Sequence, residues 1–303
     1  MSPDHWLVNL SLTTLADYLL LEVGLRKELV GDIVSAATKF NYGQLPTSLH
    51  AFVGAVALIG FDKQLWAVHG GNYKVAECAL RLSQAKLNPT EVEKVTRDDS
   101  GIQSKFRIND DEDEYDLVVI ATPFIKDKSN IQVTIKDSPV NDYPYHRTIA
   151  TMVQGQLNTT SLGVTDDDLS TTHYFHLSPN FPVWSVERMT PVDYNPDQDD
   201  DLSPVYRLFS HQPVSEETIK NLFTSFTTVN VSDWLAYPDY NLDEHIPDFM
   251  LINGLYYVNG IEIAASAMEM SVLGARNVVN LIKTDIKYKS KTGPVSHSPK
   301  TEL

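Results

Sequence analysis

The chain has 303 residues, of which 42% are hydrophobic and 21% are charged, a globular composition with length enough for a large core and for two domains. Its 40 acidic and 24 basic residues give a formal net charge of −16. This balance argues against nucleic acid and anionic membrane surfaces as main partners, because both attract basic patches.

The first 60 residues predict helices. Within residues 6–40, apolar positions such as Leu15, Leu19 and Val23 recur at helical spacing. Residues 48–60 are apolar on nearly every side, which favours a buried helix. The apolar run in this region, residues 51–61, is too short to cross a bilayer, so we predict no transmembrane segment.

A glycine pair follows in the stretch LWAVHGGNYKVAECALRL, residues 65–82. We expect a short strand at 65–68, a turn at Gly70 and Gly71 that brings the backbone close to a ligand, and a helix over 74–84. Residues 87–98 and 104–109 read as two strands of a hairpin around a turn at 98–101.

The acidic run DDEDEYD, residues 110–116, precedes an apolar run. It lacks the spaced oxygen ligands and glycine bend of a metal loop, so we interpret it as a solvated loop and predict no metal site. Residues 117–121 are continuously apolar, which is typical of a parallel strand covered on both faces.

The second half of the chain is rich in β-patterns. Residues 148–157 and 205–210 predict strands, residues 218–226 a short helix, and residues 250–282 a strand, a glycine turn and a long helix. Because α/β segments flank a β-rich block, we predict a mixed α/β (α+β) fold in which one domain is entered twice and a second is inserted.

The order of a glycine pair, a helix, a strand with Val92 and Val95, a hairpin and DLVVIATP resembles the flavin amine oxidase superfamily. The strings AFVGAVAL, LWAVHGGN, WLAYP and LYYVNGIEIAASAMEM, with KTEL at the end, are similar to the prenylcysteine oxidase family within it. The resemblance implies the FAD/NAD(P)-binding two-domain flavoprotein oxidase fold. The segments that it predicts are a helical part of the substrate domain (1–60), an FAD-domain segment (61–128), a β-rich substrate domain (129–245), a C-terminal FAD-binding segment (246–286) and a polar tail (287–303).

The resemblance also implies which residues contact FAD. Glu262 would approach the ribityl or pyrophosphate region after the turn glycine Gly260, and a helix-start amide at Met268 would face the flavin, since helix starts suit an electron-rich flavin edge. Val92 would reach the adenine through its backbone, although a half-buried strand valine explains it equally, as an ordinary strand-to-helix turn would explain Gly260. The family's glycine turn adds three cofactor-binding candidates, Gly70, Gly71 and Asn72.

The activity that the resemblance implies is oxidation of a thioether. A hydride leaves the prenyl carbon beside sulfur for FAD, water traps the resulting cation, and the product collapses to cysteine and a prenyl aldehyde, while dioxygen is reduced to hydrogen peroxide. No nucleophile–base pair stands out, so the sequence identifies no catalytic residue. Two alternatives stay open: a flavin amine oxidase, and a non-catalytic lipid-binding or interaction module.

The family's FAD domain begins with a G-x-G-x-x-G unit, and no G-x-G occurs in this chain. We therefore expect an incomplete FAD domain, belonging to the C-terminal part of a longer protein, that binds FAD weakly or not at all by itself. The family passes through the secretory route to lysosomes or the cell exterior, whereas MSPDHWLVNL lacks the pattern of a signal peptide. Glycosylation on that route would use the sequons at Asn9, Asn158 and Asn230.

Overall fold

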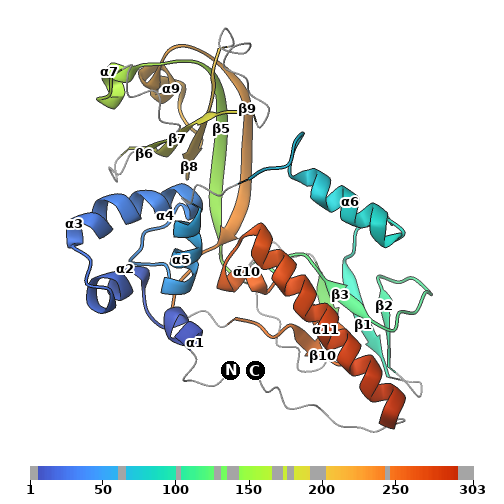
Figure 1. The fold of residues 1–303 in the computed structure, drawn as a ribbon. Helices are drawn as coiled ribbons and strands as arrows, with labels where there is room; N and C mark the ends of the chain where they lie inside the picture. The colour runs from blue at the N-terminus through green and yellow to red at the C-terminus, as the bar shows by residue number, and fades with distance from the viewer. Residues whose placement is uncertain are drawn as a thin grey trace.

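A computed structural model describes most of the chain and shows a helical group, a large sheet and two small sheets (Figure 1). The described residues are 6–60, 66–99, 104–125, 131–134, 143–165, 173–175, 181–191, 203–242 and 246–292. No helix within these ranges has both the length and the apolar character needed to cross a membrane.

The N-terminal helices form one group, as the spacing of apolar residues predicts. Leu15, Leu19, Val30 and Val34 are buried together in it. His50 caps the last helix by accepting a hydrogen bond at Nδ1 from the Val53 amide, at 3.2 Å. The helical segments, including two π-helical ones labelled η, are α1 (Trp6–Ser11), α2 (Leu15–Asp17), η1 (Tyr18–Glu22), α3 (Lys27–Leu29), η2 (Val30–Val34), α4 (Ser35–Tyr42) and α5 (Ala51–Ile59).

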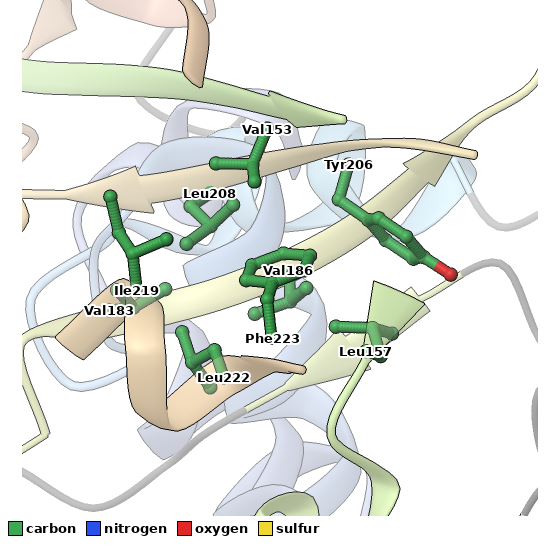
Figure 2. Packing of buried hydrophobic residues seen from close by; sticks show 9 residues of the cluster. All are labelled: Val153, Leu157, Val183, Val186, Tyr206, Leu208, Ile219, Leu222 and Phe223. Atoms are coloured by element: carbon green, nitrogen blue, oxygen red, sulfur yellow. The ribbon is translucent and has the colours of Figure 1, made fainter. Parts of the chain in front are cut away.

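The large sheet is antiparallel and has the strand order β6-β7-β8-β5-β9. Its strands are β5 (Tyr145–Leu157), β6 (His173–Phe175), β7 (Val183–Met189), β8 (Val205–Ser210) and β9 (Phe223–Pro238). Helices α7 (Thr159–Leu162) and α9 (Glu216–Leu222) lie at its far end. Figure 2 shows the apolar cluster in which Ile219 and Leu222 of α9 pack against the sheet residues Val153 and Leu208.

The predicted helix over 218–226 is wrong beyond Leu222. Phe223 begins β9, where it pairs with Leu157 and is buried. The chain leaves the helix there because strand pairing buries the phenylalanine in the cluster of Figure 2.

Two small sheets share one apolar cluster that includes Val95, Phe106, Ile120 and Leu255. In one of them β3 pairs in parallel with β11, as the apolar run over 117–121 predicts. The prediction that this strand is covered on both faces is wrong, because Val119 is 44% exposed. The strands are β1 (Lys94–Asp98), β2 (Lys105–Ile108) and β4 (Gln132–Thr134) in the first sheet, and β3 (Val118–Ile120), β10 (Met250–Ile252) and β11 (Leu255–Tyr257) in the second.

The hairpin of β1 and β2 is confirmed, but its first strand is shorter than predicted. Before Lys94, the side chain of Asn109 takes the place of a partner strand. Its Oδ1 accepts from the Glu93 amide at 2.8 Å, and its Nδ2 donates to the Glu91 carbonyl at 2.9 Å. Those side-chain bonds satisfy the backbone without a ladder, so residues 87–93 form no strand.

The helices of the remaining segments are α6 (Tyr73–Ser83), α10 (Ile261–Ala264) and α11 (Met268–Thr292). The strand predicted at 65–68 is wrong for its described part, 66–68, which forms no strand, while residue 65 lies outside the described residues. The polar tail predicted from residue 287 starts inside α11, and residues 293–303 lie outside the described ranges.

Candidate cofactor site

The turn after β11 lies at the carboxyl edge of a parallel strand pair. β3 and β11 run in the same direction, and the Val258 amide donates to the Ile120 carbonyl at 3.0 Å where both strands end. In open α/β sheets, ligands bind outside the carboxyl ends of parallel strands. The turn predicted to hold the cofactor therefore lies at a favourable edge.

A cavity of about 580 Å³ opens beside this edge. Its walls include Val92 and Val95 from the β1 side and Ala121 and Thr122 just after β3. The structure thus places Val92 in the wall of a cavity at the end of β3, where a bound group would reach its backbone. Val92 lies before β1 and belongs to no strand, so its reading as a strand valine is wrong, while the adenine contact stays a prediction.

Gly260 is required at the turn for steric reasons. A Cβ on this residue would lie 2.6 Å from Cγ of Pro247 and 3.2 Å from the Tyr257 ring, closer than side-chain atoms pack. The backbone approach that glycine allows here brings the start of α10 against the end of β11.

Glu262, the acidic residue that follows, accepts a hydrogen bond from the hydroxyl of Tyr145 at 2.8 Å. Burial, then the Glu262 charge, raises the pKa of Tyr145, so its hydroxyl stays a donor at neutral pH. Nδ2 of Asn259 is buried and makes no hydrogen bond of good geometry within the described residues, yet it lies near enough to the Tyr145 hydroxyl to lower that pKa. The turn therefore carries an orphaned amide on one side of Gly260 and a carboxylate on the other.

Two further tyrosines hold the segment that links α10 to α11. The buried Tyr240 hydroxyl accepts from the Ser266 amide at 2.7 Å and donates to the Glu262 carbonyl at 3.1 Å. The Tyr42 hydroxyl donates to the Ser266 carbonyl at 2.9 Å. Burial is the main cause that raises the pKa of both phenols, so both remain protonated and able to donate.

Sequence reasoning missed Asn259 and the three tyrosines Tyr42, Tyr145 and Tyr240. Tyr145 and Tyr240 approach each other only because β5 pairs with β9, in a register that sets Tyr145 opposite Pro238. Tyr42 comes from the helical group. No local pattern distinguishes such tyrosines from core aromatics, whereas Asn259 adjoins the turn glycine and could have been considered with it.

The other predicted residues fall into two places. Met268 begins α11 on the same segment as Gly260 and Glu262, and its side chain is 57% exposed. Gly70 and Gly71 adopt positive φ angles of 79° and 115° in a turn ahead of α6, a conformation that favours glycine.

This turn lies apart from the β11 segment in its described contacts. Oδ1 of Asn72 accepts from the Val68 amide at 2.9 Å, which closes the turn locally. Helix α6 buries none of its residues. Within the described residues, no hydrogen bond links Gly70, Gly71 or Asn72 to Val92 or to residues 259–268.

The described part of the chain also shows no group of three His, Cys, Asp or Glu side chains placed to hold a metal.

Curated relatives of the chain include proteins named prenylcysteine oxidase 1 and prenylcysteine oxidase 1-like. Prenylcysteine oxidase 1 of Bos taurus is 34% identical over 284 residues, which cover 86% of this chain and 55% of that protein. Prenylcysteine oxidase 1-like of Homo sapiens is 30% identical over 315 residues, covering 98% of this chain and 63% of that protein. The chain thus spans just over half the length of the curated relatives that it matches most strongly.

Solved structures share the fold. Cyclohexylamine oxidase from Brevibacterium oxydans IH-35A superposes with a TM-score of 0.53 at 12% identity, over 92% of this chain and 69% of that one. Reduced UDP-galactopyranose mutase gives a TM-score of 0.54 at 12% identity, over 93% and 69%. The mixed α/β fold expected from the sequence is confirmed. Since the prenylcysteine lyase family model matches residues 3–293, nearly the whole chain, the chain belongs to the prenylcysteine lyase family.

Proposed function

We propose that this chain provides the substrate domain and part of the FAD site of an oxidase that cleaves prenylcysteine to cysteine and a prenyl aldehyde. Its relatives named prenylcysteine oxidase support the reaction and the substrate class. The structural observation that carries the proposal is the placement of the Gly260 turn and the Val92-lined cavity at the shared end of β3 and β11.

The residues at this edge fit FAD. The orphaned Asn259 amide and the Glu262 carboxylate offer a donor and an acceptor for ribityl hydroxyls or the pyrophosphate. The cavity wall around Val92 is largely apolar, as an adenine ring requires. When bound, FAD would supply the redox chemistry by accepting a hydride from the prenyl carbon beside sulfur and passing electrons to dioxygen, with hydrogen peroxide as product.

The chain's own residues would bind and orient the reactants. The tyrosine hydroxyls fix the backbone of residues 262–266, so the groups that face the flavin keep their places. In the apolar helix α5, Val53 and Ala57 are buried in the core with Tyr42 and Tyr240. We therefore expect a prenyl-binding surface to use residues other than Val53 and Ala57.

We also propose passage through the secretory route to lysosomes or the cell exterior, supported by the family resemblance alone. On that route the sequons differ in suitability. Asn230 is exposed on β9, where its Nδ2 donates to Oγ of Ser232 in the same sequon at 3.4 Å. The Asn158 side chain accepts from the Ser161 amide and donates to the carbonyl of Asn221, a residue of α9. A mass shift with N-glycosidase that disappears in Asn230→Gln would test this assignment, and an unshifted secreted chain would refute it.

The function is tested by supplying the part of the bovine relative that lies outside the match. We would fuse that part ahead of Met1 and compare the fusion with the chain alone. The fusion is expected to purify with stoichiometric flavin absorbance and to release peroxide with farnesylcysteine, while the chain alone holds little flavin. Turnover of an amine but not of farnesylcysteine would favour an amine oxidase. A fusion without flavin would leave the chain as a binding module.

A further inference from the structure

One phenol from outside the candidate cofactor turn bonds to the carboxylate of the turn. Glu262 follows Gly260 in the sequence, and the Tyr145 hydroxyl donates to its Oε2 at 2.8 Å. A hydroxyl from the large sheet therefore holds the side chain that the turn offers to a ligand as an acceptor.

The position of this phenol is fixed by the large sheet. Tyr145 is the first residue of β5, a strand paired with β9 along its whole length and with β8 along part of it. The pairing of Tyr145 with Pro238 holds its backbone whether or not the turn is occupied. The backbone of Tyr145 therefore has a fixed position, from which the hydroxyl can hold the Glu262 side chain.

We propose that Tyr145 is a positioning residue for the cofactor, which holds the Glu262 carboxylate in the orientation that binds the ribityl chain of FAD. The inference deepens the proposed function and rests on it. Because the phenol donates to Oε2, Oε1 is left to accept from a ribityl hydroxyl, and the carboxylate need not reorganise when FAD binds.

Tyr145 can donate to the Glu262 carboxylate only while its hydroxyl is protonated. Burial and the nearby carboxylate raise the pKa of this phenol, so it donates throughout the neutral range. A phenylalanine at 145 would preserve the ring and remove only the donor, which makes Tyr145→Phe a conservative test.

The test measures FAD affinity of the fusion described above by quenching of flavin fluorescence, in Tyr145→Phe, Glu262→Gln and the double variant. A hydrogen bond to a charged group sets the expected loss for Tyr145→Phe at roughly tenfold in Kd. If Tyr145 acts through Glu262, the double variant binds FAD no more weakly than Glu262→Gln. Tyr206→Phe, a buried tyrosine of the same sheet in the cluster of Figure 2, should leave Kd unchanged.

The inference would be overturned if the Kd of Tyr145→Phe for FAD lies within twofold of the wild-type value. It would also be overturned if the losses of FAD affinity in the two single variants add in the double variant. An equal loss of FAD affinity in Tyr206→Phe would indicate general weakening of the sheet and would likewise overturn it. A wild-type fusion that binds no FAD would overturn the proposed function, and the positioning role with it. The urea midpoints without FAD of wild type, Tyr145→Phe, Glu262→Ala and their double variant provide a separate check, because alanine removes the acceptor that glutamine would keep. A zero coupling between positions 145 and 262 would refute the hydrogen bond itself.

Discussion

Tyr240→Phe should destabilise the chain far more than the loss of one surface hydroxyl. The hydroxyl of this 3%-exposed residue serves two backbone groups, the Ser266 amide at 2.7 Å and the Glu262 carbonyl at 3.1 Å. The phenylalanine ring fills the same space, so no cavity forms and the cost comes from two polar groups left without partners. At ~1–2 kcal/mol for each, the free energy of unfolding should fall by about 2–4 kcal/mol.

Urea unfolding of the purified chain, followed by far-UV circular dichroism, would measure this change. We expect a lower midpoint at an unchanged slope, because the surface exposed on unfolding stays the same. Tyr73→Phe is the control, since Tyr73 is 61% exposed on α6 and its replacement should change stability by less than about 0.5 kcal/mol. A loss below about 1 kcal/mol for Tyr240→Phe would refute the two-bond reading of this hydroxyl.

Two further predictions concern pH and glycine. Burial lowers the pKa of His50 below its ordinary value of 6.5. As the pH falls, the imidazole is therefore protonated in the unfolded chain before it is protonated in the folded chain. The free energy of unfolding should be highest above pH ~6.5 and fall as the pH drops below that value. His50→Asn keeps a cap acceptor for the Val53 amide but removes the titrating group. The urea midpoint of this variant should fall less between pH 7.5 and 5.5 than that of the wild type. An equal fall would exclude His50 as the source of the pH dependence. Gly155→Ala should lower the melting temperature more than Gly163→Ala does, because a Cβ at position 155 would lie 2.1 Å from the Ser225 carbonyl oxygen. A Cβ at position 163 would lie in open space, so the cost there comes only from the φ of +69°. Similar melting temperatures would contradict the steric argument.

Much of the fold could be predicted because the signals were local. The helix over 51–59 and the parallel strand at 118–120 follow from local runs of apolar residues, although Ile59 and Val119 stay exposed. Predictions failed where a distant partner decided the backbone. Asn109 replaces strand pairing before residue 94, and the pairing of Phe223 with Leu157 ends a helix that local propensity would continue.

The site divides in the same way. Gly260 and Glu262 could be identified from a contiguous motif, and Val92 from its place in the order of elements. Asn259 adjoins the same motif and could have been considered with it, whereas Tyr145 reaches Glu262 only through the tertiary structure, so no spacing in the sequence reveals it. A residue that positions another residue is specified by tertiary structure, and a contiguous motif does not identify it.

The two glycine turns of the chain differ in what holds them. The Gly260 segment is fixed by hydroxyls from the helical group and from the one end of the β5–β9 pair where Tyr145 lies opposite Pro238, so these two parts of the molecule set its geometry. The Gly70 turn is closed by bonds among its own residues, since the Val68 amide donates to Oδ1 of Asn72 and the Gly71 amide donates to the Val68 carbonyl. The helix that follows it buries no residue. Substitutions on the β5–β9 pair should therefore alter cofactor affinity through the Gly260 segment and leave the Gly70 turn unaffected. Tyr145 and Tyr240 therefore couple the orientation of the predicted cofactor turn to the register of the β5–β9 pair.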